Sequence, residues 1–171
     1  QPIMQREYER HTSELTDDIA ASVEFIHFVC ANLPALEIPL LPSTLDPVVI
    51  FTDAEGKKRS GARAPSGHLG FVVYHPVYGK RYAYHPVPRD WTRLFDKLKE
   101  RDTYIAQYEL AAAITPLLSL PPEWLEGRPV ALWIDNAGAI GALVKGYSGV
   151  PDCARIVNLF HFAAAKVGIK S

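Results

Sequence analysis

The sequence has only two cysteines, Cys30 and Cys153, far apart in the chain. This excludes a disulfide-stapled scaffold and a zinc ribbon, and it is typical of a reducing compartment. No apolar run reaches the roughly 18 to 20 residues that a membrane-spanning helix needs, so we expect no membrane-embedded part. Residues 1–7 are polar and lack the apolar segment of a signal peptide. We therefore expect an intracellular protein, in the cytoplasm, the nucleus or an organelle.

The 171 residues, 48% of them hydrophobic and 22% charged, predict one soluble globular domain with room for a short appendage. The net charge of −1 hides an asymmetry, because eleven basic and only three acidic residues lie between Lys57 and Arg101. A segment of charge +8 is typical of a surface that binds a polyanion such as nucleic acid. The alternative is an ordinary solvated face, and charge alone leaves both open.

Residues 1–46 are predicted to hold a helix and a proline-rich linker. Apolar residues recur every three to four positions from Leu15 to Cys30, and Pro34 ends this run. Four prolines between 33 and 47 exclude a regular helix or a central strand there. The core domain is therefore expected at 47–171.

The core domain reads as an α/β pattern with a mixed sheet. Strands are expected at 48–52, 67–74, 82–87 and 130–134, with the middle two forming a hairpin. The first and last of these are continuous apolar runs, which suit strands buried on both faces. Helices are expected at 90–101, 103–115, 136–145 and 151–166, with Pro116 kinking or ending the second. Asn136 should cap the third helix, and Gly146 and Gly168 should end the last two.

Three acidic residues are the feature of the sequence that best indicates a functional site. Asp53 and Asp135 each follow an apolar strand, and parallel neighbours would bring both to one rim of the sheet. Glu109 lies on the crossover helix beside Tyr108 and four residues after Ile105, which turns it toward the sheet. Each acid alone has an ordinary explanation as a turn or surface residue. The three together would repel one another unless a cation lay between them.

Such an all-oxygen site selects a hard ion, Mg²⁺ or Mn²⁺. Two ions held by carboxylates promote phosphodiester hydrolysis, because one activates the attacking water and the other stabilises the leaving oxygen. The sequence therefore predicts two ions, with Asp53, Glu109 and Asp135 as catalytic metal ligands.

The residues Phe51-Thr52-Asp53-Ala54, Glu109-Leu110-Ala111-Ala112 and Trp133-Ile134-Asp135-Asn136 are similar, in this order, to the three motifs of ribonuclease H. They particularly resemble the ribonuclease H domains joined to reverse transcriptases in DIRS-like and pararetrovirus-like elements. The resemblance covers about residues 47–171. It implies a five-stranded mixed sheet of order 3-2-1-4-5 flanked by helices, and hydrolysis of the RNA strand of RNA–DNA hybrids. It also implies a reverse transcriptase domain upstream in the same polyprotein, with residues 1–46 as the tail of its thumb or connection.

One feature of the family has no counterpart in the sequence. The family carries a fourth carboxylate after a fifth strand, near the start of the last helix. Here Asp152 is the only acidic residue after Asp135, and it comes before the penultimate helix. We expect Asp152 to be a first-turn acid that interacts with the helix dipole.

Binding of the hybrid backbone is expected from basic residues of the loop after the first strand and of the hairpin: Lys57, Lys58, Arg59, Arg63, Lys80 and Arg81. Tyr74, Tyr82, Tyr84 and Trp91 interleave with basic residues, and they suit stacking on bases or packing in the core equally well.

A second hypothesis is a domesticated ribonuclease H-like module without strong activity, acting as a binding or structural subunit of a larger nucleic-acid-associated assembly. A third is a related nuclease such as an integrase or resolvase, which the order of the motifs favours less.

Overall fold

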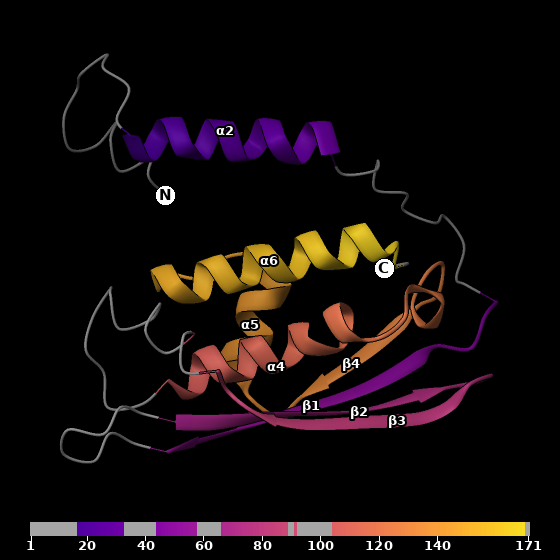
Figure 1. Ribbon diagram of the computed structural model, residues 1–171. Helices are drawn as coiled ribbons and strands as arrows, with labels where there is room; N and C mark the ends of the chain where they lie inside the picture. The colour runs from indigo at the N-terminus through magenta and orange to yellow at the C-terminus, as the bar shows by residue number, and fades with distance from the viewer. Residues whose placement is uncertain (1–16, 33–43, 58–65, 89–90, 92–103, 170–171) are drawn as a thin grey trace. The chain divides into compact units, whose positions relative to one another are not determined.

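The chain folds into two compact units, Gln1–Ala35 and Leu36–Ser171. The computed structural model describes residues 17–32, 44–57, 66–88, 91 and 104–169. Helix α2, Asp17–Asn32, belongs to the first unit (Figure 1). It agrees with the helix predicted from the spacing of its apolar residues, while the predicted linker between 33 and 43 lies outside the described residues.

The second unit is built on a four-stranded mixed sheet of order β3-β2-β1-β4. Strands β1 (Val48–Lys57), β2 (Ser66–His75) and β3 (Gly79–Pro86) form an antiparallel meander, and β4 (Val130–Ile134) lies parallel to β1. The predicted meander and parallel crossover are confirmed. The first four positions of the predicted strand order also hold, and no fifth strand occurs among the described residues.

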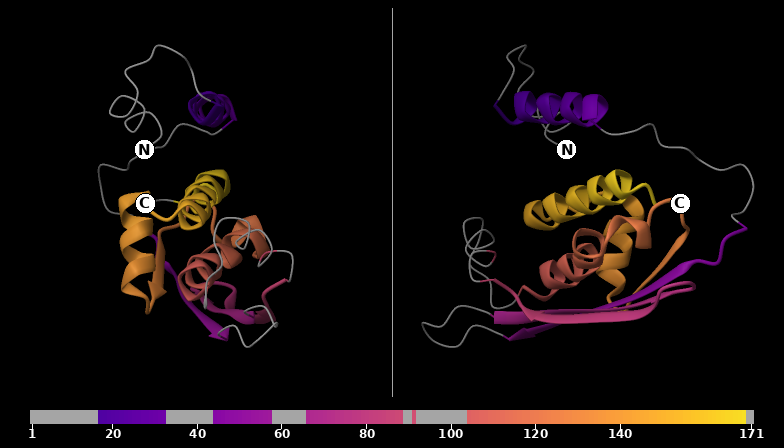
Figure 2. Two further views of the ribbon diagram at one scale, coloured as in Figure 1. Left: turned by 90° about the vertical axis from the view of Figure 1, so that its left-hand side faces the viewer. Right: turned by 45° about the vertical axis from the view of Figure 1, so that its right-hand side comes forward.

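Three helices of this unit lie on one side of the sheet: α4 (Ile105–Ser119), α5 (Ala137–Lys145) and α6 (Pro151–Val167) (Figures 1 and 2). A short 3-10 turn, Pro122–Trp124, leads from α4 into β4. Asn136 caps α5 by accepting a hydrogen bond from the Ala139 amide at 3.0 Å. Gly146 and Gly168 end α5 and α6 with positive φ values of 73° and 71°, as predicted.

Helix α4 continues past Pro116 to Ser119, so of the two effects predicted for Pro116, ending the helix is wrong. Pro116 lacks the amide hydrogen that would reach Ala112, but the helix is already near its last turn there. The Thr115 hydroxyl donates to the Ala111 carbonyl at 2.9 Å, and the Leu120 amide donates to the Pro116 carbonyl at 3.0 Å. The helix predicted at 90–101 lies outside the described residues apart from Trp91. Among the described helices, none combines the length and apolar character needed to cross a bilayer.

The core fills the space between the sheet and α4 and α6. Val48, Ile50 and Val73 are fully buried on the helix-covered face of the sheet. Alternate residues point the other way, and Phe51 and Trp133 are 45% and 60% exposed. The prediction that β1 and β4 are buried on both faces is therefore wrong. A short apolar run does not distinguish a strand covered on both faces from one whose second face carries exposed aromatic side chains.

Candidate metal centre

The parallel pairing of β1 with β4 brings the first two acids together. The strands are in register up to the pair Thr52 and Ile134, and Asp53 and Asp135 are the next residue on each chain. Because parallel strands run in the same direction, both carboxylates lie at the same point of the sheet. Ligand oxygens from Asp53, Asp135 and Glu109 all lie within 4.8 Å of one another. The predicted meeting of three acids distant in sequence is confirmed.

Glu109 approaches this pair from the helix layer. Tyr108 and Ala112, which flank it on α4, are fully buried against the sheet. This packing places Glu109 where β4 has ended, and its side chain is only 4% exposed. Burial, and then the negative charges of Asp135 and Asp53, raise the pKa of Glu109 to about 7.

The Glu109 carboxyl is the unsatisfied member of the cluster. Its Oε2 atom is buried and has no hydrogen-bond partner, whereas the exposed Asp53 accepts a hydrogen bond from the Ala54 amide at 2.8 Å. A buried carboxylate oxygen without a donor is costly, and a cation shared with two other carboxylates removes that cost. The three residues could therefore hold a divalent metal ion, and an all-oxygen donor set suits Mg²⁺ or Mn²⁺.

The turn after β4 is fixed by local hydrogen bonds. Asn136 follows Asp135 directly and caps α5 through the Ala139 amide. On the β1 side, the Thr52 hydroxyl approaches the Trp133 carbonyl at 3.5 Å and bridges the two strands. The backbone that carries Asp53 and Asp135 is thus held from both sides before any ligand binds.

Asp152 has a structural position, as expected, and lies outside the converging carboxylates. It is 3% exposed in the first turn of α6, and its Oδ1 accepts a hydrogen bond from the Cys153 amide at 3.0 Å. Its Oδ2 accepts a hydrogen bond from the Gln107 side chain at 2.8 Å. Gln107 lies two residues before Glu109, so this bond ties α4 to α6 close to the three acids. This pair could not be predicted from the sequence, because neither residue belongs to a motif.

Gly67 on β2 allows α4 to approach the sheet. A Cβ atom added there would lie 2.5 Å from Cε2 of Tyr108 and 2.4 Å from the Glu55 carbonyl oxygen. Gly67→Ala is therefore expected to push α4 outward, lower the free energy of unfolding by about 1–3 kcal/mol and shift Glu109 away from its partners. Chemical denaturation with and without Mn²⁺ measures both effects.

The matched control for this substitution is Gly141→Ala in α5, where an added Cβ meets nothing within 4 Å. Alanine is preferred to glycine inside a helix by about 0.5–1 kcal/mol, so this variant should be as stable as the parent or slightly more stable. A Gly67→Ala protein with unchanged stability would contradict the close packing of Tyr108 on β2.

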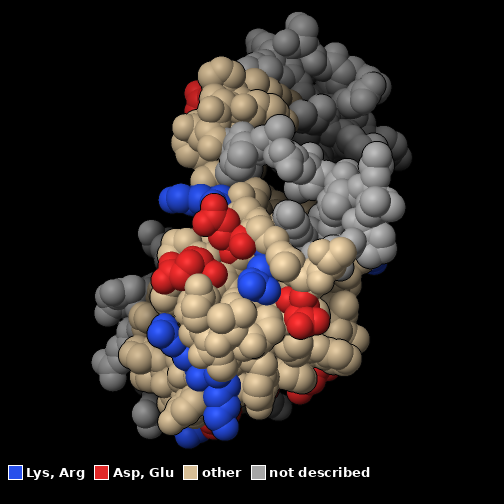
Figure 3. Space-filling view, turned by 90° about the vertical axis from the view of Figure 1, so that its right-hand side faces the viewer, with Lys and Arg blue, Asp and Glu red and all other residues tan. Residues whose placement is uncertain are grey.

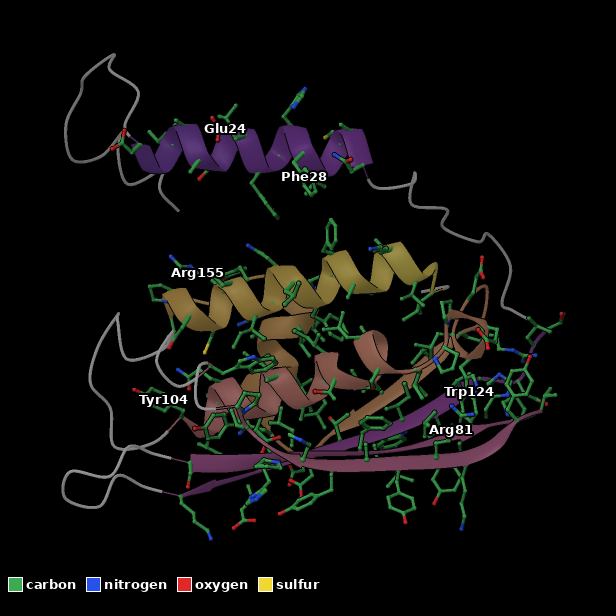
Figure 4. The ribbon with its side chains drawn as sticks, in the orientation of Figure 1. Glu24, Phe28, Arg81, Tyr104, Trp124 and Arg155 are labelled. Carbon is green, nitrogen blue, oxygen red and sulfur yellow. The ribbon has the colours of Figure 1, made fainter. Side chains whose placement is uncertain are left out.

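The predicted nucleic-acid-binding residues are spread widely. Lys57 ends β1 as the partner of Ser66 rather than lying in the loop, because the β1–β2 ladder is longer than expected. Lys80 and Arg81 lie at the other end of the sheet, on β3. The Arg81 guanidinium lies 4.6 Å from the centre of the Trp124 ring (Figure 4). Lys58, Arg59 and Arg63 lie outside the described residues.

The end of the sheet where Arg81 lies carries charges of both signs. The space-filling view from that side shows Lys and Arg side chains interspersed with Asp and Glu side chains (Figure 3). The Arg81 side chain packs over the buried Trp124 on the helix-covered side of the sheet. The Asp53 side chain is instead exposed to solvent. The structure thus brings together the three acids but separates Lys80 and Arg81 from them along the sheet.

The three acids are the feature of the described residues that points to a function. Three carboxylates from β1, α4 and the end of β4 surround one point, and the most buried of them has an unsatisfied oxygen and a raised pKa. No family model and no curated protein matches the sequence.

Proposed function

We propose that residues 47–171 are a ribonuclease H-like domain that hydrolyses the RNA strand of RNA–DNA hybrids, as part of a retroelement reverse transcriptase. The observation that carries the proposal is the meeting of Asp53, Glu109 and Asp135 within 4.8 Å. The strand order β3-β2-β1-β4, with the acids on β1, on the crossover helix and after β4, is compatible with that fold. A fifth strand after β4 and an upstream polymerase domain belong to the same proposal.

In this proposal Asp53, Glu109 and Asp135 hold two Mg²⁺ or Mn²⁺ ions. Bound divalent ions supply activation of water and stabilisation of the leaving oxygen in phosphodiester hydrolysis. Asp53 and Asp135 present exposed oxygens at the rim, and Glu109 closes the site from the helix side. Hybrid recognition would use backbone and 2′-hydroxyl contacts rather than base reading, because double-helical RNA strands are recognised mainly by shape.

The test is cleavage of four labelled substrates of the same sequence: an RNA–DNA hybrid labelled on its RNA strand, an RNA duplex, single-stranded RNA and a DNA duplex. We expect Mg²⁺-dependent cleavage of the hybrid alone, and no cleavage in EDTA. Thermal melting with and without Mn²⁺ is measured in parallel, because an ion that binds only the folded state raises the melting temperature. A protein that Mn²⁺ does not stabilise and that cleaves no hybrid would overturn the proposal.

The second candidate is the domesticated ribonuclease H-like subunit of a larger assembly. It is favoured by the absence, among the described residues, of a fourth carboxylate in the cluster. Asp152 is bound to Gln107, and the Glu55 carboxylate accepts a hydrogen bond from the Tyr84 hydroxyl at 3.3 Å. A protein that lacks hybrid cleavage at every metal concentration would favour this candidate.

A further inference from the structure

On the open face of the sheet the strongly exposed large hydrophobic side chains are aromatic, and Val49 and Val72 on the same face are half-buried. In the four described strands, every large hydrophobic residue that is strongly exposed is aromatic: Phe51, Tyr74, Tyr82, Tyr84 and Trp133. The exposed aliphatic residues of the same unit lie before β1, in the β2–β3 turn or on helices: Leu45, Val77, Leu118, Ile140, Val144 and Leu159. We call the five strand residues the aromatic face. Side chains project from this side of the sheet, and α4, α5 and α6 cover the other (Figures 1 and 4).

The rings of the aromatic face form an ordered set. Phe51 and Trp133 are register partners on β1 and β4, and their rings stack at 5.9 Å with planes 16° apart. Tyr74 contacts Phe51 edge-on at 6.2 Å. Tyr82 is the most exposed of the five at 81%. The rings of Phe51, Tyr74 and Trp133 thus pack on one another and remain partly exposed.

The aromatic face continues into the metal centre. Phe51 precedes Asp53 by two residues on β1, which is about 7 Å along the strand on the same face. Trp133 precedes Asp135 by two residues, and Asp135 is the first residue after β4. Tyr84 is paired with Gly70, and Gly70 with Asp53. A Cβ atom added at Gly70 would lie 3.5 Å from Cδ2 of Tyr84, so the Tyr84 ring packs close to the β2 backbone there.

Tyr84 is fixed in orientation at this edge. Its ring stacks on His68 at 5.0 Å with planes only 9° apart, and its hydroxyl donates to the Glu55 carboxylate at 3.3 Å. A ring held in this way loses little rotational freedom when a ligand stacks on it, so binding costs less entropy.

We propose that the aromatic face binds an unpaired nucleic-acid strand by base stacking and leads it to the metal centre. An unpaired strand offers free base faces, which a duplex does not, and aromatic side chains stack on every base. Lys57 and Lys80, at opposite ends of the exposed strands, are suited to contact its phosphates. The proposal rests on the proposed function only in naming the metal centre as the place where the strand arrives.

The test is binding of fluorescein-labelled dT12 and U12 to the full chain, measured by anisotropy in EDTA. Trp133→Ala and Tyr82→Ala are each expected to weaken binding about tenfold, since one base–aromatic stack contributes about that factor. Trp133→Phe should restore most of the affinity. Tyr147→Ala is the matched control, because Tyr147 is 58% exposed but lies between α5 and α6. It should bind as the parent does.

The salt dependence separates stacking from charge. With two lysines in contact, log K should fall with log salt at a slope of about −1.4. Unchanged binding in both alanine variants, with a steep slope, would assign binding to the basic segments and overturn the proposal. So would aromatic substitutions that alter self-association in sedimentation but leave oligonucleotide binding unchanged. Because EDTA removes the metal, loss of hybrid cleavage and loss of strand binding are distinguishable.

Discussion

Asp53→Asn is expected to lower the rate of Mg²⁺-dependent hybrid cleavage by about 100-fold or more while leaving the protein folded. Asp53 is exposed, and the hydrogen bond that its Oδ1 accepts from the Ala54 amide remains possible with asparagine. The substitution removes one of the three negative charges that would face a bound cation, and with it part of the charge that holds the ion in place. It also removes repulsion from the buried Glu109, so the metal-free variant should be as stable as the parent or more stable.

Glu123→Gln is the matched control for Asp53→Asn, because Glu123 is an exposed acid in the short turn Pro122–Trp124, outside the cluster. It removes the same charge and should leave cleavage unchanged. The rate of hybrid cleavage and the melting temperature in EDTA are measured for both variants. Full activity in Asp53→Asn, or an equal loss in Glu123→Gln, would contradict a catalytic role for Asp53.

The meeting of the acids was predictable because each step follows from local sequence. Two apolar runs end in aspartate, and a helical crossover before the second is typical of parallel strands, whose carboxyl ends lie at one rim. The inward direction of Glu109 follows from its place beside Tyr108 and after Ile105. The burial of Glu109 between two exposed aspartates was the one part of this arrangement that the sequence did not predict. The raised pKa of Glu109 depends on how closely α4 packs on the sheet, and that is set by distant residues such as Gly67.

The open aromatic face and the Gln107–Asp152 pair could not be predicted. A run such as Val48–Thr52 is equally apolar whether one or both faces of its strand are covered, so the sequence favoured burial on both. Whether helices cover the second face of a strand is decided by the whole fold and not by the residues of that strand. Gln107 and Asp152 are 45 residues apart in the chain and meet only because α4 and α6 pack together.

The stability of the metal-free protein is expected to fall as the pH rises from about 4.5 to 7. Glu109 has a pKa of about 7 in the folded protein, against 4.5 as its ordinary value. Between these values the folded state binds a proton that the unfolded state has lost, so raising the pH disfavours folding, and the effect levels off above the folded pKa. Glu109→Gln cannot ionise, and it should abolish this decline in melting temperature measured in EDTA.

Divalent metal should reverse the same decline, because only the ionised Glu109 is a good ligand. Mn²⁺ is therefore expected to raise the melting temperature little at pH 5 and strongly at pH 8, and to leave Glu109→Gln almost unchanged at both. Calorimetric titration with Mn²⁺ at pH 7, in buffers of different ionisation enthalpy, should show release of about half a proton per protein, and none at pH 9. Proton release that persists at pH 9 would place the titrating group elsewhere. Equal stabilisation of the parent and Glu109→Gln by Mn²⁺ would remove Glu109 from the ligands and leave Asp53 and Asp135 as an exposed acidic pair.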